Sequence, residues 1–166
     1  MAVFVDPWQT QPIDWLILQN GYVQKYFKEE ILNADIKWFQ EEKYHIIEFD
    51  CRVWTNNKAF HDDLKQKLKF PDYYGGNYDA LNDCLSDLEF PETGILFVFR
   101  HLDFYAKEEA QRLLDLCSRN SRYYLLFGNR LITLIQIDYP DIEYTPTGAC
   151  SVLWNGTEWI DSQRKP

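Results

Sequence analysis

Residues 94–100 read GILFVFR, and within this stretch five apolar residues follow one another without a polar interruption. Such a run is typical of a strand that is covered on both faces, as in the parallel sheet of an α/β protein. Helical patterns lie on either side, because residues 57–70 and 107–120 carry apolar side chains at spacings of three and four. The order of elements predicts an α/β fold with a three-layer core, in which helices flank a small parallel sheet.

Three more segments are predicted to form strands, and the last of them lies beyond the core. Residues 36–54 are interpreted as one or two strands around a polar break at residues 41–43. Two apolar runs follow the second helix, RYYLLFG at 122–128 and RLITLIQID at 130–138, and both resemble buried strands.

The two ends of the chain are predicted to be β additions to the core. Asn20-Gly21 and Asn155-Gly156 lie between apolar runs, which is a hairpin signal, and residues 28–35 suggest a short helix. We therefore expect an N-terminal extension over residues 1–42, a core over 43–129 and a C-terminal β extension over 130–166. All three are expected to pack as one compact unit.

The charge of the chain limits its partners. It carries 26 acidic and 17 basic residues, a formal net charge of -9. Nucleic acids and anionic membranes would be repelled, whereas a basic protein or a cation would be attracted. The first residues lack a basic region and carry Asp6 and Asp14, and no apolar run reaches about 20 residues. We expect a cytoplasmic protein, most simply a monomer without a cofactor.

Cysteine and histidine provide no metal or catalytic motif. The four cysteines form no CxxC pair and no cluster with histidine, so a zinc site is not expected. Buried free thiols are the simplest interpretation. His45 and His61 are interpreted as structural or surface residues. The aromatic ends, which include Trp8 and Trp159, are expected to pack against the core, although a second partner surface is an alternative.

A dense group of acids follows the first helix, where residues 71–83 read PDYYGGNYDALND. Asn77 is a plausible N-cap for a helix whose apolar face includes Leu81 and Leu85. Asp79 and Asp83 lie four residues apart on the other face, where like charges repel each other. No Lys or Arg lies between residues 69 and 100. Three interpretations remain open: a solvated helix face, joint ligation of Mg²⁺, or a surface for a basic partner protein.

Residues 64–88, LKQKLKFPDYYGGNYDALNDCLSDL, resemble the signature of the barstar family of intracellular ribonuclease inhibitors. The resemblance rests on a Pro-acid-Tyr-Tyr-Gly stretch followed by Asn-x-Asp-Ala-Leu-x-Asp-Cys-Leu. With the surrounding strands it covers roughly residues 43–129. It implies a non-enzymatic inhibitor or immunity protein that occludes the active site of a basic ribonuclease or nuclease toxin.

The resemblance also implies which residues contact the enzyme. Asp83 would take the place of substrate phosphate, Asp79 would pair with a second basic group, and Tyr73 would stack at the rim. The full implied set comprises Tyr73, Tyr74, Gly75, Asn77, Asp79, Asn82, Asp83 and a later acid, Asp115. The chain departs from the family at Asn82, where Trp is frequent, and at Gly76, where an acid is common.

Two other functions are kept as alternatives. A metal-dependent enzyme would use the Asp79 and Asp83 pair as its metal ligands. A barstar-like scaffold could instead bind a protein other than a nuclease through its added β elements.

Overall fold

A five-stranded parallel sheet, in the order β2-β3-β4-β1-β5, forms the centre of the chain in a computed structural model that describes residues 11–165. The strands are β1 (Val23–Tyr26), β2 (His45–Asp50), β3 (Ile95–Arg100), β4 (Leu131–Gln136) and β5 (Leu153–Trp154). The helices are α1 (Ile13–Gln19), α2 (Glu29–Glu41), α3 (Asn57–Leu68), α4 (Tyr78–Ser86) and α5 (Lys107–Leu125).

Strand β3 is buried on both faces, as its uninterrupted apolar sequence predicts. It pairs in parallel with β2 on one side and with β4 on the other. Ile95, Phe97 and Phe99 pack into one apolar cluster, together with the buried side chains of α3, α4 and α5. Leu96 and Val98 point to the other face and pack with residues of α1 and α2. The period of two along the strand thus divides the core into two halves.

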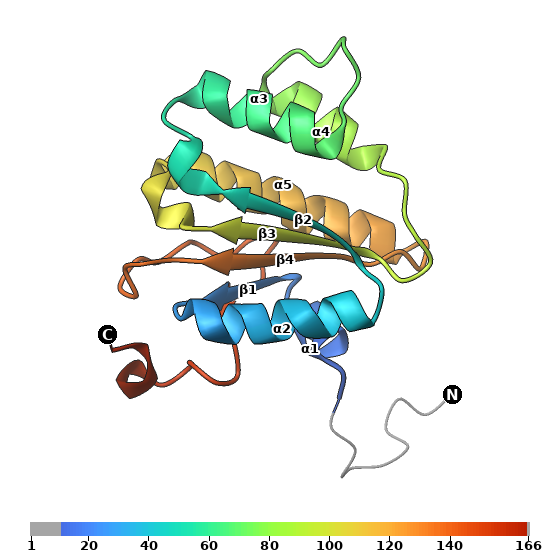
Figure 1. Cartoon of the computed structure of the whole chain (residues 1–166). Helices are drawn as coiled ribbons and strands as arrows, with labels where there is room; N and C mark the ends of the chain where they lie inside the picture. Colours follow the sequence, from blue (N-terminus) through green and yellow to red (C-terminus); the bar gives the residue numbers. More distant parts are fainter. Residues whose placement is uncertain (1–10, 166) are drawn as a thin grey trace.

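The molecule has three layers (Figure 1). Helices α3, α4 and α5 cover one face of the sheet, and α1 and α2 cover the other. The predicted α/β class with a parallel sheet between helices is confirmed. None of the helices within residues 11–165 is long and apolar enough to cross a membrane.

The prediction of a strand at residues 122–128 is wrong, because this stretch contains the last turn of α5, which ends at Leu125, and a non-helical turn after it. Tyr124 is buried while Tyr123 and Leu126 are exposed, which is the burial pattern of a helix. The strand that follows, β4, lies between β3 and β1 in the middle of the sheet. It is therefore an integral core strand and not part of an added C-terminal β extension.

Both predicted hairpins are also wrong. Residues 13–19 form α1, and Asn20 ends this helix with its side-chain amide donating to the Leu16 carbonyl at 2.7 Å. Gly21 has φ +109° and leaves room for Cys150, whose Cβ would lie 2.4 Å from an added Cβ. The Asn-Gly pair thus closes a helix and allows close packing instead of turning a hairpin.

The remaining parts of the predicted N-terminal and C-terminal β additions also differ from the prediction. Helix α2 continues to Glu41, so residues 36–41 are helical and not part of a strand. Strand β5 pairs in parallel with β1, and residues 155–158 turn away without a returning strand. Residues 1–10 of the predicted N-terminal extension, including Asp6 and Trp8, lie outside the described residues.

All four cysteines are free thiols, as predicted, but the burial predicted for them is found for only two. Cys51 and Cys117 are buried, whereas Cys84 and Cys150 are only partly covered. Burial raises the pKa of Cys117 to about 12, so this thiol stays protonated and unreactive at neutral pH.

Candidate protein-binding face

Helix α4 presents the acids that the sequence singled out. The helix begins after Asn77, whose side-chain oxygen accepts a hydrogen bond from the Ala80 amide at 2.8 Å, as predicted for an N-cap. Leu81 and Leu85 are buried against the core. Asp79, Asp83 and Asp87 are exposed on the opposite side of the helix. The helix therefore packs on the core through its apolar face and presents a row of carboxylates to solvent.

Side-chain hydrogen bonds tie α4 to α5 along its length. At its start the Tyr78 hydroxyl donates to a Glu109 carboxylate oxygen at 2.5 Å. At its end the Tyr124 hydroxyl donates to the Leu85 carbonyl at 2.6 Å and accepts from the Leu88 amide at 2.9 Å. These bonds hold the acidic row in a fixed orientation.

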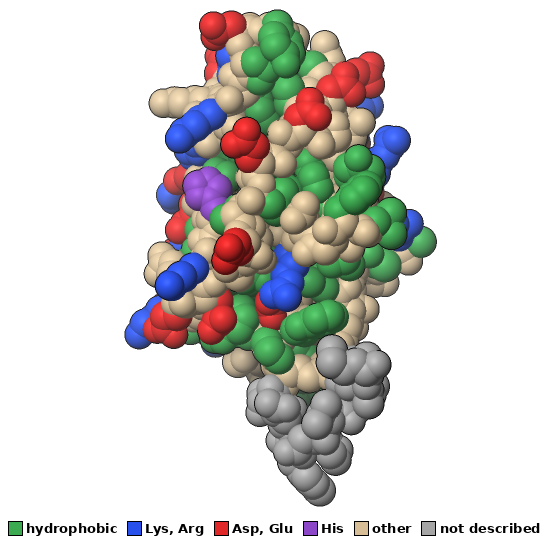
Figure 2. All heavy atoms as spheres, turned by 90° about the vertical axis from the view of Figure 1, so that its right-hand side faces the viewer, with side chains coloured by type: hydrophobic (Ala, Val, Ile, Leu, Met, Phe, Trp, Pro, Cys, Tyr) green, Lys and Arg blue, Asp and Glu red, His purple; other side chains and the backbone are tan. Residues whose placement is uncertain are grey.

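The carboxylates of this row make no ion pair with the described part of the chain. The ion pairs found within residues 11–165 include none of Asp79, Asp83 and Asp87. Burial raises the pKa of the Cys84 thiol, and the nearby charges of Asp83 and Asp87 raise it further. Figure 2 shows acidic side chains on the upper part of one face, the level at which Figure 1 places α3 and α4.

The loop before α4 separates its two tyrosines. Tyr73 is 84% exposed, whereas Tyr74 is 9% exposed and packs on Phe70. The Tyr74 amide donates to the Pro71 carbonyl at 3.0 Å, which closes a turn, and Gly76 has φ +63°. The turn therefore presents one aromatic ring to solvent and uses the next one as an anchor.

His61, on α3, lies beneath this loop and was missed as a contributor to the site. It is 4% exposed, and its Nδ1 lies 2.5 Å from the Tyr74 hydroxyl. Its spacing contained a usable signal, because His61 follows Phe60 and precedes Leu64 by three positions on the apolar side of the helix. A polar residue on a buried helix face usually has a specific partner.

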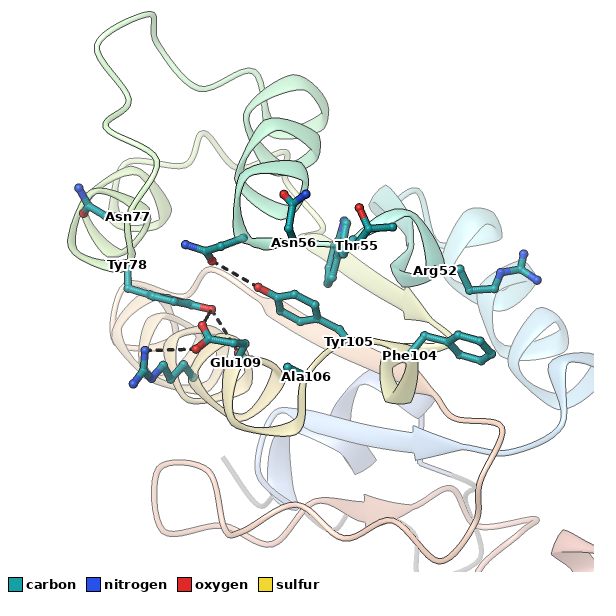
Figure 3. A pocket seen from close by; sticks show the side chains of 12 residues that line it. Arg52, Thr55, Asn56, Asn77, Tyr78, Phe104, Tyr105, Ala106 and Glu109 are labelled. Carbon is teal, nitrogen blue, oxygen red and sulfur yellow. Dashed lines mark hydrogen bonds and ion pairs between the residues drawn. The ribbon is translucent and has the colours of Figure 1, made fainter.

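An open pocket of about 750 Å³ adjoins the N-terminal end of α4 (Figure 3). Residues from the starts of three helices line it, among them Asn56, Asn77, Tyr78, Tyr105 and Glu109. Figure 3 shows the Tyr78 side chain pointing toward Glu109 at one end of this pocket. Burial, and next the hydrogen bond to Glu109, raise the pKa of Tyr78, so its hydroxyl remains a donor.

The predicted contact residues divide into three groups. Tyr73, Gly75, Asn77, Asp79 and Asp83 are exposed on the loop and on α4. Two others are engaged internally: Tyr74 is buried, and the Asn82 side chain accepts from the Asn120 amide at 3.3 Å.

The third group is Asp115 alone, which is exposed but lies on α5, away from the loop and α4. It accepts a 3.3 Å hydrogen bond from Gln111, which also bonds to the main chain of Thr145. Asp115 therefore lies on the side of α5 that faces the 145–148 segment, whereas Asn120 and Tyr124 face α4. A contact with the partner remains a prediction for every residue of this face.

Within residues 11–165, no group of three or more His, Cys, Asp or Glu side chains is arranged to hold a metal ion. Asp79 and Asp83 are thus a pair without a third such ligand in that part of the chain. Two carboxylates alone would leave most of the coordination of Mg²⁺ to water or substrate.

Comparison with solved structures shows a likeness of fold. The structure of Drosophila ORC bound to AT-rich DNA and Cdc6 superposes with a TM-score of 0.50 at 18% identity, which is a likeness of fold alone. The match covers 76% of this chain and 44% of that chain, so this protein spans less than half of its length.

The sequence relatives are more specific. A Bacillus subtilis (strain 168) protein named "Putative ribonuclease inhibitor YrdF" is 43% identical over 70 residues, which are 42% of this chain and 77% of that protein. Residues 44–136 match the family described as "Barstar (barnase inhibitor)". This match includes β2, the loop with Tyr73, the acidic helix α4 and the core strands β3 and β4. The chain belongs to the barstar family.

Proposed function

We propose that this protein is an inhibitor, or immunity protein, that binds a basic ribonuclease or nuclease toxin inside the cell and blocks its active site. One observation carries the proposal. In a member of the barstar family, Asp79 and Asp83 are exposed, make no ion pair within residues 11–165, and lie on a helix that is anchored at both ends.

The chemistry of the target explains why such acids are useful. A ribonuclease binds the phosphates of RNA with Arg, Lys and His side chains, and carboxylates can accept the same hydrogen bonds. In this proposal Asp83 takes the place of a phosphate, and Asp79 pairs with a second basic group. Tyr73, on the adjoining loop, covers the rim of the enzyme's site.

The charge of the whole protein also favours such a partner. With a net charge of -9, the inhibitor attracts a basic enzyme over distances longer than a hydrogen bond. Rapid capture matters for an immunity protein, because a free toxin molecule cleaves many substrates before it is bound. The proposed contacts therefore act after an electrostatically accelerated encounter.

The test is a titration of small basic secreted ribonucleases with this protein, in which RNA cleavage and binding are measured together. The double variant Asp79→Ala/Asp83→Ala should weaken binding by about a thousandfold, since each hydrogen bond to a charged group contributes about 1.5–3 kcal/mol. Its unfolding free energy should be unchanged or a few tenths of a kcal/mol higher, because a repulsive i,i+4 pair is removed.

Matched variants separate a specific face from general acidity. Glu30→Ala removes an exposed acid from α2, on the other side of the sheet, and should change binding by no more than about twofold. Asp115→Ala tests the one predicted contact that lies outside both α4 and the loop before it. A double variant that binds an inhibited ribonuclease as tightly as the native protein, with the same salt dependence, overturns the proposal.

A further inference from the structure

We propose that His61 is a positioning residue for the binding loop: through Tyr74 it holds residues 69–77 in place, and it does so only while its ring is neutral. The proposal rests on the proposed function for its link to a partner. Its structural part concerns this protein alone and can be tested without a ribonuclease.

The geometry makes the His61–Tyr74 pair the inner anchor of the loop. The 2.5 Å contact joins α3 to a residue that lies between the exposed Tyr73 and the turn at Gly75-Gly76. A Cβ added to Gly76 would lie only 3.9 Å from the Cβ of His61, so the turn passes close over the histidine. Moving His61 therefore moves the segment that carries Tyr73 and the helix cap Asn77.

The second ring nitrogen decides which charge state this anchor accepts. The Nε2 atom of His61 is buried and has no hydrogen-bond partner within residues 11–165. A neutral imidazole has one N–H, whereas the cation has two, and the one on Nε2 would then lack a protein acceptor. A buried donor without an acceptor is costly, and more so when it carries charge.

The surroundings of the ring are largely aromatic. Phe60 on α3, Tyr74 on the loop and Tyr78 on α4 lie with ring centroids 4.8–5.8 Å from that of His61. The charged groups that act on the ring are Asp62 on its own helix and Glu109 on α5, and both favour the cation. Burial outweighs them, and the pKa of His61 is lowered from its ordinary value.

The direction of the pH effect follows from this shift. A histidine whose pKa is lower in the ordered loop than in the free state stabilises the loop fully above the ordinary histidine pKa of about 6.5. That stabilisation is lost as the pH falls toward the lowered pKa. Between these two pKa values, order decreases by up to about tenfold per pH unit, and below the lowered pKa no further loss occurs because the ordered loop is then protonated as well.

The experiment follows the loop in the native protein by NMR between about pH 8 and pH 5. The amide signals of Gly75 and Gly76 should shift with the same midpoint as the ring signals of His61. In His61→Asn, a carboxamide replaces the Nδ1 edge of the ring and cannot be protonated in this range, so both glycine signals should stay constant. His45→Asn replaces an exposed histidine on β2 and should leave the titration as in the native protein.

A second variant keeps the proposal testable if changes at His61 disturb folding. Tyr74→Phe removes only the hydroxyl, and amide exchange at residue 74 should become about fivefold to tenfold faster above pH 7, the effect of one lost hydrogen bond. His61→Leu should accelerate amide exchange at residue 74 to the same extent as Tyr74→Phe. His61→Asn should accelerate it less, because its carboxamide can bond to the Tyr74 hydroxyl.

Binding separates this proposal from the proposed function. A ribonuclease that the protein inhibits should bind more weakly at pH 5.5 than at pH 7.5 to the native protein, with a smaller decrease for His61→Asn. If no basic ribonuclease binds, the proposed function fails while the loop titration still stands. Glycine signals that do not follow His61, or that titrate equally in His61→Asn, overturn the role of His61.

Discussion

Glu158 and Asp83 are both carboxylates of one acidic protein, yet they differ in burial and in their hydrogen-bond partners. Glu158 is fully buried and accepts hydrogen bonds from the main-chain amides of Phe27 and Lys28, at 2.9 and 2.8 Å, and from Asn155 at 2.6 Å. Asp83 is exposed and takes part in no ion pair within the described part of the chain. The first acid is saturated inside the molecule, and the second is available to another one.

The difference shows which acids of a strongly acidic chain belong to the fold. Asp14 resembles Glu158, because it accepts from the Tyr44 hydroxyl at 2.7 Å and from Arg130 at 3.0 Å. Acids of this kind stabilise the fold, and their carboxylates are not available to bind a partner. Net charge alone therefore does not locate a binding surface, and the proposed surface rests on carboxylates that make no ion pair within residues 11–165.

The largest effect on stability is expected for Glu158→Ala. It leaves two main-chain amides and an asparagine amide without their acceptor, and it should lower the unfolding free energy by about 3 kcal/mol. Urea unfolding measures this loss, and Asp79→Ala is the matched control, with an expected change within about 0.5 kcal/mol. Equal effects of the two substitutions would remove the distinction between structural and available acids.

A smaller loss is expected for Tyr124→Phe, which tests how α4 is held. The variant removes one hydroxyl that makes two hydrogen bonds to the end of α4, so it should lower the unfolding free energy by about 2 kcal/mol. Tyr123→Phe changes the neighbouring, half-exposed tyrosine and should be almost neutral. Amide exchange at Leu88 should accelerate only in the first variant, and no change there would mean that the acidic row is fixed by other contacts.

The smallest expected effect is on the alkylation rate of Cys84, which reports the electrostatic effect of the neighbouring carboxylates. Asp83→Asn removes a charge that raises the pKa of Cys84, so the thiolate fraction at pH 8 should increase and alkylation of Cys84 should become about twofold faster. Mass spectrometry of the native protein resolves this site from the other cysteines. Asp72→Asn, on the loop, is the control and should leave the rate unchanged.

Sequence reasoning succeeded where local patterns decide the structure. The apolar run of β3, the cap at Asn77 and the buried face with Leu81 and Leu85 depend on neighbours within a few residues. The acidic row was predicted for the same reason, because a helix with a known apolar face defines its solvent face. The contiguous barstar motif then supplied a function that no single residue indicates.

The errors arose where distant parts of the chain decide. The stretch 122–128 is rich in aromatic and leucine residues that suit a buried strand, but its backbone continues the bonding of a long helix. Asn20-Gly21 carries a hairpin signal, yet β1 pairs in parallel with β4 and β5 instead of with a neighbour in sequence. His61 was undervalued because its partner, Tyr74, lies on a separate loop.

The pairing of β1 also joins segments of the chain that are synthesised at different times. Phe27 and its acceptor Glu158 are separated by 131 positions, and β1 lies between β4 and β5, the two strands that follow the other three in sequence. During synthesis the segment that contains α1, β1 and α2 has no finished sheet edge to join until β4 has emerged. The acidic helix and its tyrosine loop precede β4 in the chain. A nascent molecule therefore contains the acidic helix and its tyrosine loop before α1, β1 and α2 can pack through pairing of β1 with β4.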